Sequence, residues 1–445
     1  MESTRRERVG WYFYGWADHA FYTTVTAVVI APYLTGIAKV AAGCTASSDD
    51  KCSDGYLHPL GLKIAAGSFY PYLVTLAVIL SVVTLPVVGA IADRSTHKRK
   101  LLGVFAGIGV LATFGFFFVT GDRYLLGGAL FILATMGLSA GAVVYNSFLP
   151  QLAAPEKRDM VSSIGWSLGY IGGGLHLALC LAAFTVFGIS GTSTRWVMVS
   201  AGVWWGLFTV VSLVRLRDRP PIEVAELGGN RLTAGFRQLG HTLRDLRKYP
   251  LTLFFLGAYL IYNDGIQTVI SQASLYATEE LGLQTGTLAT TILVIQFVAF
   301  GGALSLGRLA KRIGAWKTVL LSLILWIGVV LTAFWLPAHN PAAFMLLGAA
   351  LGLVLGGSQA LSRSLFSQLI PRGKEGEYFG FYALADKGMS WLGPLVFGLT
   401  YQSTHSYRAG IVMLLIFFVV GFCALLAVPM RRAIVASGNV PPRVL

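Results

Sequence analysis

Charged residues are scarce in this chain of 445 residues: Asp, Glu, Lys and Arg together make up 12%, about half their share in soluble domains. So few charges could not cover the surface of a globule this large, which excludes an ordinary water-soluble protein. Cysteine is scarce too, with four residues, which excludes a disulfide-rich scaffold. Apolar residues are abundant instead, at 55% of the chain, and the mean hydropathy is +0.68. These values are typical of an integral membrane protein.

Twelve apolar segments are long enough to cross a membrane, which requires about 20 mainly apolar residues. They predict an all-α membrane protein with two six-helix bundles. The basic segment 215–250 is expected to be a cytoplasmic linker between an N-terminal bundle (1–214) and a C-terminal bundle with a short cytoplasmic tail (251–445). The expected helices lie at 11–38, 67–91, 101–119, 125–149, 162–187, 197–214, 251–278, 286–306, 318–336, 342–369, 379–402 and 408–429.

Lys and Arg are distributed unevenly between the predicted loops. Of the 34 residues, 26 lie at the two chain ends or in loops after even-numbered helices, and six lie in the other loops. Loops rich in Lys and Arg stay in the cytoplasm, so both termini are predicted to be cytoplasmic. The net charge of +14 is then explained by membrane orientation, and we expect no nucleic-acid partner.

Motifs for cofactor chemistry are absent from the sequence. It contains no G-x-x-x-x-G-K-[ST] phosphate loop, no H-E-x-x-H and no C-x-x-C, so we expect no nucleotide motor, no metal site and no other cofactor. Cys44 and Cys52 share one polar loop and could form a disulfide in an oxidising compartment; the alternative is that both remain free thiols.

Two segments at corresponding positions of the two halves have similar sequences. Segment 89–99 (GAIADRSTHKR) follows the second predicted helix, and segment 307–317 (GRLAKRIGAWK) follows the eighth. This similarity indicates a duplicated six-helix unit with the same topology in both copies. The first segment also resembles the signature loop of the major facilitator superfamily, G-x-x-x-D-R-x-x-x-[KR]-[KR]. That resemblance implies that Gly89, Asp93 and Arg94 form a cytoplasmic latch. The alternative is an ordinary basic loop.

Six motifs carry a narrower resemblance: WYFYGWADHAF (11–21), YNSFLP (145–150), SIGWSLGYIGGG (163–174), YNDGIQT (262–268), GGSQALSRSLF (356–366) and YFGFY (378–382), the last followed by Lys387 and by GP (393–394). Together they resemble the vacuole-effluxer branch of that superfamily, the autophagy-related amino-acid exporters and their bacterial relatives. The resemblance implies the major facilitator fold and export of neutral amino acids by alternating access. The branch commonly reads Y-D-W-A-N-S-A-F in the first helix, whereas this chain has Gly15, Asp18 and His19 at the altered positions.

Ionisable residues inside a membrane span need a reason, because each costs about 2.5–3.5 kcal/mol to insert. Asp18 and Asp264 lie in the first and seventh helices, and each could exchange a proton, pair with a substrate ammonium or cap a neighbouring helix. His19 could tune the proton affinity of Asp18. Arg363 and Lys387 could bind a substrate carboxylate, with snorkelling as the alternative for Arg363. The uncharged candidates for substrate contact or helix association are Asn146, Asn263, Gln267 and Gln359.

These features predict a secondary transporter for a small polar solute, and not an enzyme. Export of a neutral amino acid is what the resemblance implies, and proton coupling through a carboxylate is one way to drive it. The alternatives are a membrane-embedded enzyme that acts on a lipid and a transporter-like solute sensor. We expect membrane lipids around a monomer. The short loops favour the bacterial inner membrane.

Overall fold

The computed structural model describes residues 4–44, 55–152, 155–219, 240, 244–370, 378, 381–382, 389–442 and 444–445. The chain separates into two compact units, Met1–Arg237 and Gln238–Leu445, and the division falls inside the segment predicted as a linker. Both units are helical, apart from one two-stranded hairpin in the described part of the N-terminal unit.

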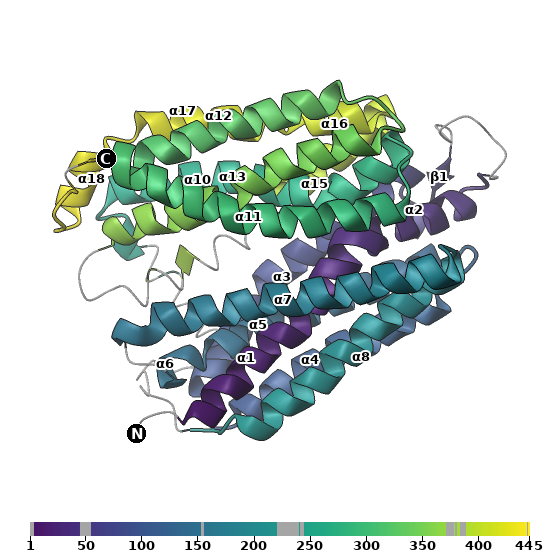
Figure 1. Ribbon diagram of the computed structural model, residues 1–445, viewed down its shortest axis with the longest axis horizontal. Coiled ribbons are helices and arrows are strands. Elements are labelled where there is room, and N and C mark those ends of the chain that lie inside the picture. The colour runs from purple at the N-terminus through teal and green to yellow at the C-terminus, as the bar shows by residue number, and fades with distance from the viewer. Residues whose placement is uncertain are drawn as a thin grey trace. The chain divides into compact units, whose positions relative to one another are not determined.

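The N-terminal unit is built from long helices that pack along one another (Figure 1). Helix α1 packs against α7 and α8, and α5 packs against α3 and α4. The first membrane span changes its hydrogen-bonding pattern midway, because the π-helix η1 connects α1 to α2. The elements are α1 (Arg5–Ala20), η1 (Phe21–Val29), α2 (Ile30–Ala41), β1 (Tyr56–Leu57), β2 (Ile64–Ala65), α3 (Phe69–Arg94), α4 (Lys98–Gly115), α5 (Tyr124–Asn146), α6 (Leu149–Leu152), α7 (Pro155–Phe187) and α8 (Gly191–Arg215).

The loop between the first two spans contains the antiparallel hairpin of β1 and β2 and begins near a cysteine. Cys44 is disulfide-bonded, whereas Cys180 and Cys423 are free thiols. Cys52 lies outside the described residues, so its pairing with Cys44 stays a prediction.

The C-terminal unit has the same helical character. Helix α10 packs against α17, and α13 packs against α11 and α12. Pro250 begins α10 and Pro341 begins α13, a position where the missing N–H of proline costs nothing. The elements are α10 (Pro250–Leu275), η5 (Tyr276–Glu280), α11 (Thr285–Ile313), α12 (Ala315–Phe334), α13 (Pro341–Gln368), α15 (Leu392–Thr404), α16 (Tyr407–Met413), α17 (Leu415–Ala427) and α18 (Met430–Ala436).

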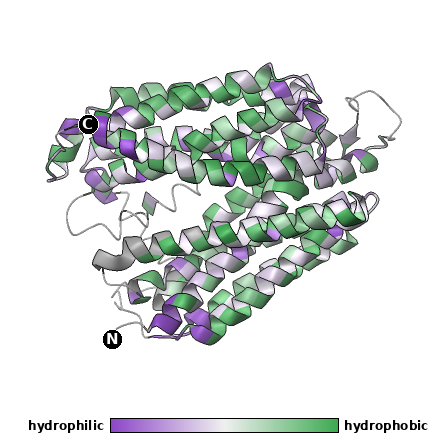
Figure 2. Cartoon of the chain, viewed as in Figure 1, coloured by the Kyte–Doolittle hydropathy of each residue, from purple (hydrophilic) through white to green (hydrophobic). Residues whose placement is uncertain are grey.

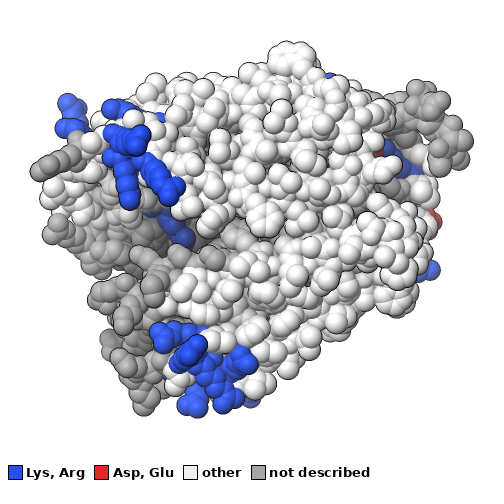
Figure 3. Space-filling view, viewed as in Figure 1, with Lys and Arg blue, Asp and Glu red and all other residues white. Residues whose placement is uncertain are grey.

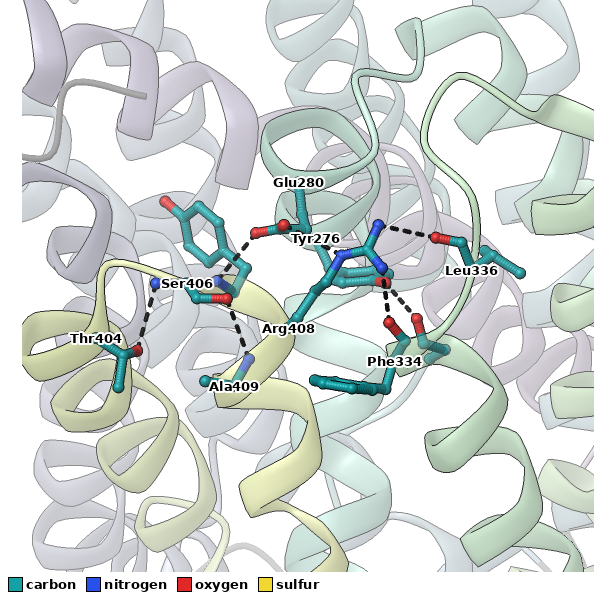
Figure 4. Close-up of polar contacts among 10 residues, drawn as sticks. Tyr276, Glu280, Phe334, Leu336, Thr404, Ser406, Arg408 and Ala409 are labelled. Carbon is teal, nitrogen blue, oxygen red and sulfur yellow. Dashed lines mark hydrogen bonds and ion pairs between the residues drawn. The ribbon is translucent and has the colours of Figure 1, made fainter. Parts of the chain in front are cut away.

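A polar cluster around Arg408 ties together one end of the C-terminal unit (Figure 4). The guanidinium donates to the carbonyl oxygens of Phe334 at 2.7 Å and Leu336 at 2.8 Å, and its Nε donates to Glu280 Oε1 at 3.3 Å. The other carboxylate oxygen of Glu280 accepts from the backbone N–H of Tyr407 at 3.1 Å. The cluster thereby joins η5, the loop after α12 and the start of α16.

Eleven helices in the described part of the chain are long and apolar enough to cross a membrane. They coincide with eleven of the twelve predicted spans. Figure 2 shows that hydrophobic residues dominate these helices and that hydrophilic residues gather towards helix ends. Of the span predicted at 379–402, the structure describes α15 with 13 residues, whereas 379–380 and 383–388 lie outside the described residues. A count of twelve spans and the cytoplasmic location of the termini therefore remain predictions.

Candidate functional site

In the N-terminal unit, Asp18 and His19 form a hydrogen-bonded pair within the first membrane span. The His19 Nδ1 atom lies 2.8 Å from Asp18 Oδ1, and Asp18 is 8% exposed. With an ionised carboxylate as acceptor, Nδ1 carries the donated proton, and Nε2 of a neutral imidazole is left as an acceptor. The π-helix begins at Phe21, close after the pair. Such helix irregularities are frequent at functional sites.

Two neighbouring aromatic side chains of α7 contact the imidazole of His19. The rings of Trp166 and Tyr170 meet it edge to face, with centroid distances of 5.5 and 5.6 Å. Gly169 lies between them in sequence and allows this approach, because a Cβ there would lie 2.8 Å from the imidazole. Trp166 is 52% exposed and Tyr170 is 48% exposed. The acid and imidazole pair therefore adjoins an exposed aromatic surface, which sequence reasoning missed although both aromatic residues belong to a recognised motif.

A second histidine in this unit has a different environment. His176 is buried, with Nδ1 2.8 Å from Thr24 Oγ1 and Nε2 3.2 Å from Ser200 Oγ. Both ring nitrogens thus have a hydroxyl partner, and the histidine links η1, α7 and α8. This arrangement is typical of a packing residue.

In the C-terminal unit, Asp264 connects α10 to the start of α15. Its Oδ2 accepts a hydrogen bond of 2.9 Å from the backbone N–H of Gly393, in the first turn of α15. A carboxylate in this position satisfies a helix-terminal donor and interacts favourably with the helix dipole. Asp264 is 1% exposed, and its Oδ1 has no hydrogen-bond partner among the described residues. A side chain at position 393 would collide with Thr268 Oγ1 and lie 3.0 Å from that Oδ1.

The remaining candidates fall in several environments. Asn263 is buried beside Asp264, and Gln267 on the same helix is half-buried. On α13, Gln359 is half-buried and Arg363 is exposed. The other two candidates are Asn146, which is exposed at the end of α5, and Lys387, which lies outside the described residues.

The predicted latch is described only in part. A Cβ at Gly89 would lie 3.8 Å from Val143 Cγ1, an ordinary contact between α3 and α5. The side chains of Asp93 and Arg94 lie outside the described residues, so their role stays a prediction.

The segment after α8, which includes Asp218 and Arg219, forms hydrogen bonds with the ends of neighbouring helices. Sequence reasoning missed this feature. Asp218 Oδ1 accepts a hydrogen bond from the backbone N–H of Arg99, in the first turn of α4, at 2.9 Å. Arg219 donates to the carbonyl oxygen of Gln151 at 2.6 Å and to Glu7 at 3.0 Å. The first residues of the predicted linker are therefore part of the N-terminal unit.

Comparison with known proteins decides the family. The family model described as vacuole effluxer Atg22 like matches residues 3–438. The chain belongs to this family. The predicted resemblance is thus confirmed across nearly the whole sequence.

Two relatives illustrate the range of this Atg22-like family. The chain is 29% identical over 436 residues to an uncharacterized MFS-type transporter, YxiO, of Bacillus subtilis, and the match covers 96% of each protein. It is 26% identical over 537 residues to autophagy-related protein 22-1 of Penicillium rubens, covering 97% of this chain and 91% of the relative.

Solved structures define the fold of the Atg22-like chain. The nucleoside transporter NupG matches with a TM-score of 0.66 at 12% identity, over 95% of this chain and 98% of NupG. A D-xylose-proton symporter matches with a TM-score of 0.64 at 14% identity, over 99% of this chain and 98% of the symporter. At these identities the likeness concerns the fold alone. Together with the family, it identifies a multi-pass membrane transporter of the major facilitator type.

Proposed function

We propose that this Atg22-like protein is a secondary active transporter that exports a small polar solute of the neutral amino-acid class. In the proposal it works by alternating access in a bacterial inner membrane and couples export to proton movement. The family description as an effluxer and the bacterial relative named as a transporter support this assignment. Each unit holds one candidate acid, and both Asp18 and Asp264 lie inside helices long and apolar enough to cross a membrane, which favours a carrier over an enzyme that acts on lipid.

The observation that carries the proposal is the environment of Asp264. Asp264 is a buried carboxylate inside a membrane span, with one oxygen bonded and the other without a donor among the described residues, and such a group is costly to insert. Proton binding removes its charge and weakens its hydrogen bond to Gly393, because charge-assisted hydrogen bonds are roughly twice as strong as neutral ones. Proton exchange at Asp264 would therefore change the strength of the hydrogen bond between α10 and the start of α15. Proton-coupled transport requires such a dependence of helix contacts on proton binding.

The Asp18–His19 pair provides a second, separate element of the proposal. Its carboxylate can attract a substrate ammonium, and the exposed side chains of Trp166 and Tyr170 can add cation–π attraction. Arg363 and Lys387 keep the role predicted from the sequence, as cations for a substrate carboxylate.

The experiment that tests the proposal is flux through the purified protein in sealed vesicles. We expect neutral amino acids to exchange across the membrane and an imposed pH gradient to drive their net movement. A nucleoside and D-xylose are the comparison solutes, since proteins of the same fold are named for them. Binding of a solute without flux would contradict a carrier and favour a sensor. Flux that is the same with and without a pH gradient would contradict only the proton coupling, and transport itself would stand.

A further inference from the structure

A cluster of arginines lies where α1 begins and α8 ends. We propose that Arg5, Arg6 and Arg215 bind the headgroup of an anionic phospholipid. With Val9, these three residues line a recess of about 470 Å³. Figure 3 shows Lys and Arg side chains gathered at one end of the N-terminal unit, where Figure 1 marks the N-terminus.

The recess exists because α1 and α8 approach closely at Gly10. A Cβ at this position would lie 2.6 Å from Cβ of Arg215, so only glycine fits without displacement. The guanidinium of Arg215 lies 5.1 Å from the ring centroid of Phe13, a cation–π contact that orients it. On the other side, Thr4 and Glu7 form a capping box that fixes the start of α1. The arginines are therefore carried on a defined framework.

The structure shows no ion pair between this cluster and an acid among the residues that it describes. Arg5 and Arg6 occupy the first turn of α1, where the helix dipole disfavours cations. The acid of that turn, Glu7, is 2% exposed and is paired with Arg219. Within the described part of the chain, Arg5, Arg6 and Arg215 have no acidic partner. An anion in the recess would supply the missing charge, and guanidinium groups match the geometry of phosphate.

The surface that leads to the recess is apolar, which points to a lipid and not to a soluble phosphate. Val203, Leu207, Val210 and Val214 recur at helical spacing along α8 and are between 52% and 63% exposed. This stripe reaches the turn that contains Arg215. In a membrane-spanning helix it lies against acyl chains, so one phospholipid molecule could contact the stripe with its tail and the arginines with its phosphate.

The test is lipid binding by the purified full-length protein in detergent, measured by native mass spectrometry and by thermal unfolding. We expect phosphatidylglycerol to bind more tightly than phosphatidylcholine and to raise the Tm. The triple variant R5Q/R6Q/R215Q should bind phosphatidylglycerol roughly a hundredfold more weakly, since each basic residue near an anionic surface contributes about a fivefold factor. Gln is a good helix former, so the lipid-free protein should still fold, with a Tm lowered only by the lost cation–π contact between Arg215 and Phe13.

The matched control removes three cations from the loop regions predicted on the other side of the membrane. The variant K63Q/R123Q/R195Q should bind phosphatidylglycerol as the unmodified protein does. The proposal is overturned if both lipids bind equally, if the arginine variant retains selective binding, or if the control variant loses it to the same degree. Equal stabilisation by inorganic phosphate overturns the lipid assignment. These readouts require no transport, so they succeed or fail independently of the proposed export.

Discussion

The guanidinium of Arg219 donates hydrogen bonds to both carboxylate oxygens of Glu7, with Nη2 3.0 Å from each. The two residues are 212 positions apart, one at the start of α1 and the other just after α8. A third hydrogen bond, from Arg219 to the carbonyl oxygen of Gln151, connects the same guanidinium to the end of α6. The start of α1 is thus joined to the segment after α8 at the end predicted to face the cytoplasm.

Replacing Arg219 by Gln should destabilise the protein by about 2 kcal/mol, because the carboxylate of Glu7 would remain buried without its cation. Unfolding by SDS in mixed micelles measures this. The double variant E7Q/R219Q should lose less than the sum of the two single variants, since the charge and its partner leave together. Lys100→Gln, at an exposed position of α4, is the control and should stay within about 0.5 kcal/mol of the unmodified protein. Additive losses would contradict the pairing.

Replacing Arg408 by Lys should cost about 2–3 kcal/mol, because one ammonium cannot reproduce the donations to Phe334, Leu336 and Glu280. The same unfolding measurement reports the loss. Arg123→Lys serves as the control, since Arg123 is exposed and donates to the carbonyl oxygen of Phe118 at 3.3 Å. Equal stability of the two variants would mean that the cluster in Figure 4 adds little.

Substituting Gly393 by Ala should destabilise the C-terminal unit by about 1–3 kcal/mol, because the new methyl group would overlap Thr268 and press on Asp264. Gly301→Ala is a matched control on α11, where nothing lies within 4 Å of the added Cβ. There the gain in helix propensity should stabilise the protein by as much as about 1 kcal/mol. A tolerated alanine at position 393 would show that α10 and α15 are not packed as described.

Substituting Gly169 by Ala should reduce transport without a comparable loss of stability. The added methyl group displaces the imidazole of His19 from its edge-to-face contacts with Trp166 and Tyr170, so substrate affinity should fall. We expect the KM for a neutral amino acid to rise roughly tenfold, which corresponds to about 1.4 kcal/mol. Gly174→Ala on the same helix meets nothing within 4 Å and should transport normally. Equal KM values for the two variants would remove His19 from the substrate site.

The spans could be predicted because membrane insertion is read from local composition. The segment predicted at 342–369, for instance, is α13 in the structure. The π-helix at Phe21–Val29 could not be predicted, since an apolar run has the same composition in α and π geometry. The ion pair between Glu7 and Arg219 could not be predicted either, because no local sequence pattern links the two residues. For Asp264 the sequence allowed both a proton site and a helix cap, and the bond to Gly393 required coordinates to detect.

Proton-driven transport through Asp264→Asn tests the central claim most directly. The amide oxygen can still accept from Gly393, so the fold should persist, whereas the side chain can no longer exchange a proton. In sealed vesicles, exchange of a neutral amino acid between the two sides should continue, and accumulation driven by a pH gradient should be lost. Asp122→Asn, in a loop, should leave both activities unchanged. Gradient-driven accumulation that survives Asp264→Asn would contradict the account.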